Sequence, residues 1–185
     1  CFDGAFKLNS KLGKSMNRNT RIAIIGAGLG GLVAGALLQQ RGYRPRIFEQ
    51  APEFARLGAG INLSPNVMKI LRQIGLEPRL LAIGIRPKSW VSRDLITGEI
   101  LFEYRMRDVM ESAFDAPYIT IHRGDFHEAL NSAVDSGSVE FGRRVVSIEQ
   151  FPDSVRLNFL HEPSVDVDFV IGADGIDSVV REALL

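Results

Sequence analysis

The sequence has 185 residues, of which 45% are hydrophobic and 24% are charged, as is usual for a globular domain with one core. Lysine and arginine together number 22, and so do aspartate and glutamate, so the formal net charge is zero. This balance argues against bulk attraction to nucleic acid or to an anionic membrane, and we expect neither as a partner. The single cysteine, Cys1, excludes an intrachain disulfide and is typical of a reducing compartment, so we expect a cytoplasmic protein.

Both ends of the sequence have the character of a partial chain. Residues 1–20 are polar and aperiodic and do not begin with methionine, so we interpret them as a disordered leader or an expression remnant. At the other end, residues 179–185 favour a helix but contain no helix stop signal. We therefore expect residues 21–185 to be part of a domain that is truncated before its C-terminal portion.

The first predicted elements form a strand–helix–strand unit. Residues 22–25 are typical of a buried parallel strand, residues 29–40 of a helix that Gly42 ends, and residues 46–49 of a second strand. The apolar stripe of the helix is expected at Leu32, Val33, Ala36 and Leu37. Three elements within about 28 residues fit a βαβ unit, so we expect an α/β fold with a parallel sheet.

The uncharged stretch from Ile22 to Gln40 allows a second interpretation. It is 19 residues long, which is enough to cross a bilayer, and it contains two Gly-x-x-x-Gly pairs of the kind found in membrane helix dimers. Five glycines are crowded where the centre of such a helix would lie. The stretch also divides naturally into a strand, a turn and a helix, so we favour the βαβ interpretation.

The middle of the chain predicts a helix and a hairpin. Ser64 and Pro65 suit a helix N-cap and first turn, and Gly75 is placed to end that helix. Its apolar stripe is expected at Val67, Ile70, Leu71 and Ile74. Residues 90–104 then predict a β-hairpin that turns near Thr97 and Gly98.

The C-terminal part is predicted to be rich in strands. Residues 118–122 predict a strand, after which Asp125 is expected to cap a helix bearing Phe126, Ala129, Leu130 and Ala133. Three short strands are expected at residues 139–141, 145–148 and 155–159. A further strand is expected over residues 165–171, and a helix is expected to begin near Asp177.

A glycine motif carries the first candidate site. Gly26, Gly28 and Gly31 fit the pattern G-x-G-x-x-G between a strand and a helix. The first glycine permits the tight turn, the second lets a pyrophosphate approach the backbone, and the third lets the helix pack closely on the strand. The N-terminus of the helix then offers free N–H groups and a positive dipole end to phosphate.

Glu49 strengthens this interpretation because of its position. It lies 21 residues after Gly28, at the end of the second strand, where an acid accepts hydrogen bonds from a ribose. A surface glutamate after a glycine-rich turn is the alternative, which we disfavour because the neighbouring elements all fit the motif. The negative charge of Glu49 also disfavours a 2′-phosphate, so these residues predict either FAD or NAD.

Asp174 and Gly175 form a second constellation after the strand over residues 168–171, and Ser178 and Arg181 follow them. An acid and a glycine at the carboxyl end of a strand lie where open α/β sheets bind ligands. An acid that caps the following helix, next to a turn glycine, explains the pattern equally well. No cluster with metal-ligand spacing is visible in the sequence, so we expect no metal.

Several stretches together carry a family resemblance: residues 24–31 (IIGAGLGG), 48–52 (FEQAP), 56–61 (RLGAGI), 63–66 (LSPN), 121–125 (IHRGD) and 171–175 (IGADG) with Ser178 and Arg181. In this order they resemble the N-terminal part of the single-component FAD-dependent aromatic-ring monooxygenases, the group of p-hydroxybenzoate hydroxylase. The likeness is strongest to the salicylate hydroxylase and 6-hydroxynicotinate 3-monooxygenase type, and it covers residues 21–185. The resemblance implies a Rossmann-like FAD-binding domain with an added β-rich segment.

The resemblance also implies the contacts of the cofactor. The FAD pyrophosphate would be held by Gly26, Gly28, Leu29 and Gly31. Glu49 would bind the adenosine ribose with Gln50 beside it, and Val145 would offer backbone groups to the adenine. Further contacts would come from Arg56, Arg123, Asp174 and Gly175, the last two also serving the passage of the nicotinamide donor.

The activity that the resemblance implies is hydroxylation of a small aromatic acid with NAD(P)H and O₂. Residues 86–116 would contribute a hairpin towards the substrate domain. Asn62 stands where the enzymes nearest to 6-hydroxynicotinate 3-monooxygenase have an active-site histidine. An amide cannot accept a proton as imidazole does, so Asn62 is a candidate active-site contact and no catalytic base is assigned.

Three other functions are also compatible with the sequence. The protein could be an FAD-dependent dehydrogenase or oxidase, a plain NAD-dependent dehydrogenase, or a non-catalytic nucleotide-binding fragment. The family's later Gly-Asp motif, which closes on the flavin ribityl chain, is absent from the sequence. We therefore expect this chain on its own to be inactive.

Overall fold

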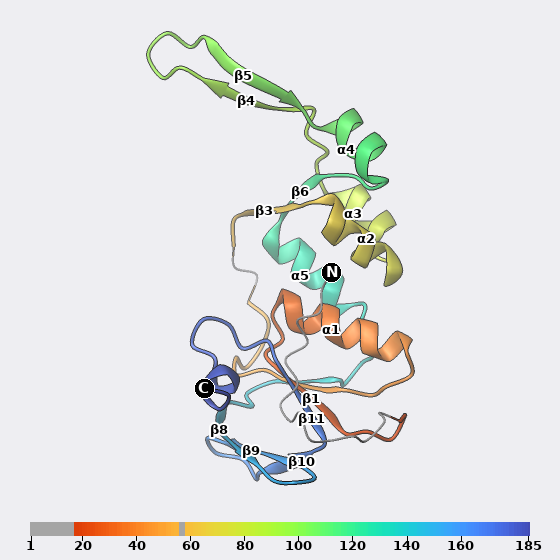
Figure 1. Cartoon of the computed structure of the whole chain (residues 1–185), viewed down its shortest axis with the longest axis vertical. Coiled ribbons are helices and arrows are strands. Elements are labelled where there is room, and N and C mark those ends of the chain that lie inside the picture. The colour runs from red at the N-terminus through yellow and green to blue at the C-terminus, as the bar shows by residue number, and fades with distance from the viewer. Residues whose placement is uncertain (1–16, 56–57) are drawn as a thin grey trace. The chain divides into compact units, whose positions relative to one another are not determined.

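The structure is a computed structural model that describes residues 17–55 and 58–185. Most of the predicted leader, residues 1–16, lies outside the described residues, and so does Arg56. The chain divides into two compact units (Figure 1). The first unit comprises the chain up to Phe54 together with Leu130–Leu185, and the second unit comprises Ala55–Ala129.

The first unit is built on a four-stranded parallel sheet with the strand order β11-β1-β2-β7. These strands are β1 (Ile22–Ile25), β2 (Arg46–Phe48), β7 (Val139–Glu140) and β11 (Phe169–Gly172). Every residue of β1 is buried, because this central strand is covered on both faces. The predicted βαβ unit is confirmed by the parallel pairing of β1 and β2.

Helix α1 (Leu29–Gln40) connects these two strands, and its bounds are those expected from the sequence. Of the predicted apolar stripe, Leu32 and Ala36 are buried, whereas Val33 and Leu37 are only half-buried. The buried face includes Gly35 instead, where an added Cβ would lie 2.7 Å from Cδ1 of Ile47. Helix α1 therefore lies so close to β2 that the contact with Ile47 has room for a glycine but not for a large apolar side chain.

The membrane interpretation of residues 22–40 is wrong, because they form β1, a turn and α1. In the described part of the chain, no helix combines the length and the hydrophobicity that a bilayer span requires.

A three-stranded antiparallel sheet completes the first unit. It has the order β10-β9-β8, with β8 at Val145–Gln150, β9 at Val155–Phe159 and β10 at Val165–Val167. Phe48 of the parallel sheet packs edge-to-face against Phe159 of this sheet, with ring centroids 5.0 Å apart. The two sheets therefore share one apolar core, which α6 (Val179–Glu182) joins through Val180.

The single strand expected over residues 165–171 is divided in the structure. β10 pairs antiparallel with β9, whereas β11 pairs parallel with β1. Asp168 lies at the break, where its N–H donates to the Arg21 carbonyl and its carboxylate binds the Arg21 guanidinium at 2.6 Å. The following helix also begins later than expected, at Val179, because Ser178 is its N-cap and accepts a hydrogen bond from the Arg181 N–H.

The second unit contains a two-stranded antiparallel sheet of β3 (Gly60–Leu63) and β6 (Ile119–His122). Its helices are α2 (Pro65–Gln73), α3 (Glu77–Ile83), α4 (Arg107–Phe114) and the greater part of α5 (Arg123–Asn131). The sequence predicted α2 and α5 but neither α3 nor α4. Leu71 and Ile74 of the expected α2 stripe are buried, but Met68 takes the buried place expected for Val67 and Ile70.

Of the two helix caps expected in this unit, the position of Ser64 is confirmed and the cap at Asp125 is wrong. Ser64 is the N-cap of α2, but its hydroxyl donates to the side chain of Asn66 and caps no backbone N–H. Asp125 lies inside the first turn of α5, which begins two residues earlier at Arg123. There the Nδ1 atom of His122 accepts a hydrogen bond from the Gly124 N–H at 3.1 Å, so a ring nitrogen takes the place expected for the carboxylate.

The predicted hairpin is present as β4 (Ser89–Arg93) and β5 (Ile100–Arg105). Its turn is held by Asp94, whose Oδ1 atom accepts hydrogen bonds from the N–H groups of Ile96 and Thr97 at 2.8 and 2.7 Å. Large apolar side chains along both strands are at least half exposed: Trp90, Ile100, Leu101 and Phe102.

Candidate functional site

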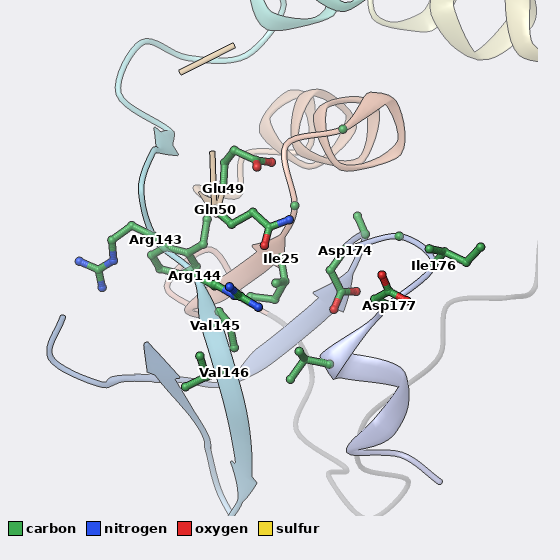
Figure 2. Close-up of a pocket in the computed structure, with 16 residues that line it drawn as sticks. Ile25, Glu49, Gln50, Arg143, Arg144, Val145, Val146, Asp174, Ile176 and Asp177 are labelled. Atoms are coloured by element: carbon green, nitrogen blue, oxygen red, sulfur yellow. The ribbon is translucent and has the colours of Figure 1, made fainter. Parts of the chain in front are cut away.

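A cavity of about 780 Å³ lies in the first unit, at the carboxyl ends of β1, β2 and β11 (Figure 2). This is the edge of a parallel sheet at which ligands bind in open α/β folds. Seven of the residues proposed from the sequence line it: Gly26, Gly28, Glu49, Gln50, Val145, Asp174 and Gly175. The cavity is therefore formed by four segments that are separated in the sequence, at residues 25–28, 48–50, 143–146 and 173–179.

The three glycines of the motif have different structural roles. Gly26 has a φ of +99°, and an added Cβ would lie 2.4 Å from the carbonyl oxygen of Ala173. A Cβ on Gly31 would lie 2.0 Å from the carbonyl oxygen of Gly26. A Cβ on Gly28 would meet nothing within 4 Å, because it would project into open space. Gly26 and Gly31 thus shape the turn, and Gly28 leaves the backbone accessible to a ligand.

The N-terminus of α1 adjoins this turn and is not capped by any side chain of the described residues. Its first turn contains no acidic residue, and Gly28 is the N-cap. The N–H groups of Leu29, Gly30 and Gly31 precede the first intrahelical donor, Leu32, which donates to the Gly28 carbonyl. These groups and the positive end of the helix dipole can therefore bind a phosphate. Leu29 and Gly31 themselves do not line the cavity.

Glu49 lies directly after β2 with its carboxylate held by the backbone. Its Oε2 atom accepts a hydrogen bond from the Ala27 N–H at 2.8 Å, and its Oε1 atom accepts one from the Ala51 N–H at 2.9 Å. The Glu49 main chain is fixed as well, because its N–H donates to the Glu140 carbonyl and its carbonyl accepts from the Arg143 N–H. Each carboxylate oxygen retains a second lone pair, which can accept from a ribose hydroxyl.

Asp174 both holds the start of the following helix and lines the cavity. Its carboxylate accepts hydrogen bonds from the Ser178 hydroxyl at 2.7 Å and from the Val180 N–H at 3.2 Å, so it stabilises the start of α6. The same residue lines the cavity, and Gly175 follows it with a φ of +83°. Asp174 thus holds the loop between β11 and α6 in place along one side of the cavity.

Two arginines that were not predicted from the sequence, Arg143 and Arg144, also line the cavity. The guanidinium of Arg143 lies over the ring of Phe159, with 4.1 Å between its Cζ atom and the ring centroid. This cation–π contact places Arg143 beside the core of the first unit. The two arginines follow Gly142, whose φ is +69°, and precede β8. A glycine turn before a predicted strand was therefore the only feature of the sequence that marked their position.

Two other candidate residues belong to the second unit. Asn62 lies on β3, where its Oδ1 atom accepts a hydrogen bond from the Thr120 hydroxyl at 2.9 Å. Arg123 begins α5, and its backbone N–H donates to the carbonyl of Ala59 at 3.0 Å. Arg56 lies outside the described residues.

A parallel sheet with a glycine turn, an open helix N-terminus and an acid at the end of the second strand defines a dinucleotide-binding α/β domain. The chain belongs to the FAD binding domain family, whose model matches residues 19–185. The expected cofactor, FAD, is therefore that of the family, and the NAD alternative is not supported.

Relatives and solved structures agree with this assignment. The chain is 45% identical over 170 residues to 6-hydroxynicotinate 3-monooxygenase of Bordetella bronchiseptica, covering 92% of this chain and 44% of that protein. It is 42% identical to 3-amino-4-hydroxybenzoate 2-monooxygenase of Streptomyces cremeus, covering 92% of this chain and 43% of that protein. The structure of Klebsiella pneumoniae HpxO complexed with FAD and uric acid matches with a TM-score of 0.80 at 27% identity, covering 89% of this chain and 42% of that chain. The chain thus spans less than half the length of the curated relatives that it matches.

Proposed function

We propose that the protein containing this chain is an FAD-dependent monooxygenase that hydroxylates a small aromatic acid with NAD(P)H and O₂. The observation that carries the proposal is the cavity at the ends of β1, β2 and β11. Seven residues that we expected to bind FAD line this cavity. Support for the reaction comes from the two monooxygenases to which the chain is 45% and 42% identical. When bound, FAD supplies the transfer of electrons from the nicotinamide donor to O₂.

The residues of this chain bind and orient the cofactor. The N–H groups at the start of α1 donate to the pyrophosphate, which approaches the backbone at Gly28. The carboxylate of Glu49, already fixed by two backbone N–H groups, accepts hydrogen bonds from the adenosine ribose. Because these groups are held before the ligand arrives, little ordering is required on binding.

The class of substrate that we propose follows from the names of the two relatives. The two named relatives act on 6-hydroxynicotinate and on 3-amino-4-hydroxybenzoate, both aromatic acids with a ring hydroxyl. We propose Asn62 as a substrate contact, with its amide oriented by the Thr120 hydroxyl, and Arg123 as a cofactor contact. We also propose a cytoplasmic location. The single cysteine of the sequence supports it, because a reducing compartment requires no disulfide.

The test is an absorbance spectrum of the purified full-length protein, compared with the variants Glu49→Ala and Gly28→Val. We expect the bands of bound flavin in the parent protein and their loss in both variants. NAD(P)H oxidation should then be stimulated by an aromatic acid, and ¹⁸O₂ should label the product. A colourless protein that takes up no added FAD would overturn the proposal, and an unlabelled product would favour a dehydrogenase or oxidase instead.

A further inference from the structure

The cavity contains one basic side chain whose role the proposed function leaves unassigned. Arg144 directly precedes β8, is exposed and lines the cavity. Figure 2 shows its guanidinium pointing towards the side that carries Asp174 and Asp177, whereas that of Arg143 points the opposite way.

The two arginines also differ in their contacts. The guanidinium of Arg143 is stacked over Phe159 and lies 3.9 Å from the Glu140 carboxylate. Within residues 17–55 and 58–185, the side chain of Arg144 makes no hydrogen bond and no ion pair. Arg144 is therefore a planar cation that faces the cavity and is available to a ligand.

The order of the binding groups indicates which part of the ligand Arg144 meets. In the AMP half of FAD the ribose lies between the phosphate and the adenine. The phosphate position at Gly28 and the ribose position at Glu49 therefore direct the adenine beyond Glu49, away from α1. The segment on that side is residues 143–145, whose first N–H donates to the Glu49 carbonyl at 2.8 Å.

We infer that Arg144 stacks its guanidinium on the face of the adenine and so determines the preference of the site for an adenine nucleotide. The inference rests on the proposed function, because it takes the cavity to be the FAD site. A guanidinium is planar and weakly hydrated, so it stacks on an aromatic ring better than an ammonium group does. The phosphate already has donors at the start of α1, which leaves the Arg144 side chain to the base.

The experiment compares ligand binding by the FAD-free full-length protein and its variants. The ligands are FAD, ADP, adenosine and FMN, of which only FMN lacks adenine. Arg144→Ala should weaken binding of FAD, ADP and adenosine by a similar factor of about 10, and should leave FMN binding unchanged. Arg144→Lys keeps the charge but loses the plane, so it should weaken the three adenine ligands nearly as much. Arg44→Ala removes an exposed arginine of the same unit that does not line the cavity, so it should change none of the four.

The possible failures can be told apart. Unchanged binding of FAD and adenosine by Arg144→Ala would overturn the role of Arg144 and leave the FAD site intact. Weaker ADP binding with unchanged adenosine binding would show a phosphate contact and overturn the stacking. Absence of FAD binding by the parent protein itself would overturn the proposed function, and this inference with it.

Discussion

The carboxylate of Glu49 accepts a hydrogen bond from the backbone N–H of Ala27 at 2.8 Å. The residue proposed to bind the ribose is therefore attached to the turn proposed to bind the phosphate, between the first and second glycines of the motif, Gly26 and Gly28. Its other oxygen binds the Ala51 N–H, so the carboxylate is fixed from both sides. The site is pre-organised by the backbone, and a change at Glu49 should affect the fold as well as the ligand.

We expect Glu49→Gln to reduce both stability and FAD affinity. The amide retains one acceptor atom but presents an NH₂ group to one of two backbone donors, which costs about 1–3 kcal/mol in the free energy of unfolding. Loss of a ribose hydrogen bond should weaken FAD binding about 10- to 100-fold. Urea denaturation and FAD titration measure the two effects. Glu53→Gln, at an exposed glutamate nearby, is the control, and equal behaviour of the two variants would contradict the role of Glu49.

Gly28 and Gly31 should respond in opposite ways to the same substitution. Gly28→Ala introduces a Cβ that meets no protein atom within 4 Å, so the free energy of unfolding should change by less than about 1 kcal/mol. The same Cβ occupies space needed by the pyrophosphate, so FAD binding should weaken at least about tenfold.

Gly31→Ala is the counterpart, because its Cβ would lie 2.0 Å from a backbone oxygen. It should destabilise the fold by about 1–3 kcal/mol or more. Thermal denaturation separates the two variants. A Gly28→Ala protein that binds FAD as the parent does would refute the phosphate position.

Asp174→Ala should destabilise the start of α6. It leaves the buried Ser178 hydroxyl and the Val180 N–H without their acceptor, at a cost of about 1–3 kcal/mol. Hydrogen exchange of the Val180 amide should become faster. Asp177→Ala is a matched control, because this exposed residue also lines the cavity but shares neither bond, and its effect should stay within about 0.5 kcal/mol. Slow exchange at Val180 in Asp174→Ala would show that the carboxylate does not hold the helix.

The hairpin turn should loosen in acid. Hydrogen bonds from the N–H groups of Thr97 and Ile96 lower the pKa of Asp94 below its ordinary value of 3.8. A lowered folded-state pKa gives stability that is fully present above about pH 3.8 and is lost as the pH falls through the lower folded value. NMR should show the Ile96 and Thr97 amide shifts titrating together below pH 3.8. Asp94→Asn keeps an acceptor but cannot titrate, so a persisting acid transition in this variant would exclude Asp94 as its cause.

Local sequence patterns predicted the part of the fold that carries the glycine motif. The bounds of β1 and α1 follow from an apolar run, a glycine turn and a periodic helix, all within 19 residues. The placement of Glu49 at the end of β2 follows from the same unit. These predictions succeeded because each depends on contacts between residues that are close in the chain.

Features that depend on distant partners were not predictable. The break at Asp168 arises because Arg21, from the other end of the chain, binds it. The short helices α3 and α4 escaped prediction because they begin after Leu76 and Met106, which are not capping residues, although Pro78 was a usable signal for α3. Arg144 resembled any surface arginine, since its place beside the cavity depends on the fold that joins β7, β8 and β2.

The pairing of β1 with β11 has a consequence for synthesis on the ribosome. Arg21 and Asp168, which sit at the start of this pairing, are 147 residues apart. The βαβ unit is translated early, but one side of β1 has no partner strand until β11 (Phe169–Gly172) has also been synthesised. Such non-local pairing is slow and leaves an apolar strand edge exposed in the nascent chain. We expect the N-terminal strand to need shielding during translation, although it becomes one of the most deeply buried strands of the folded protein.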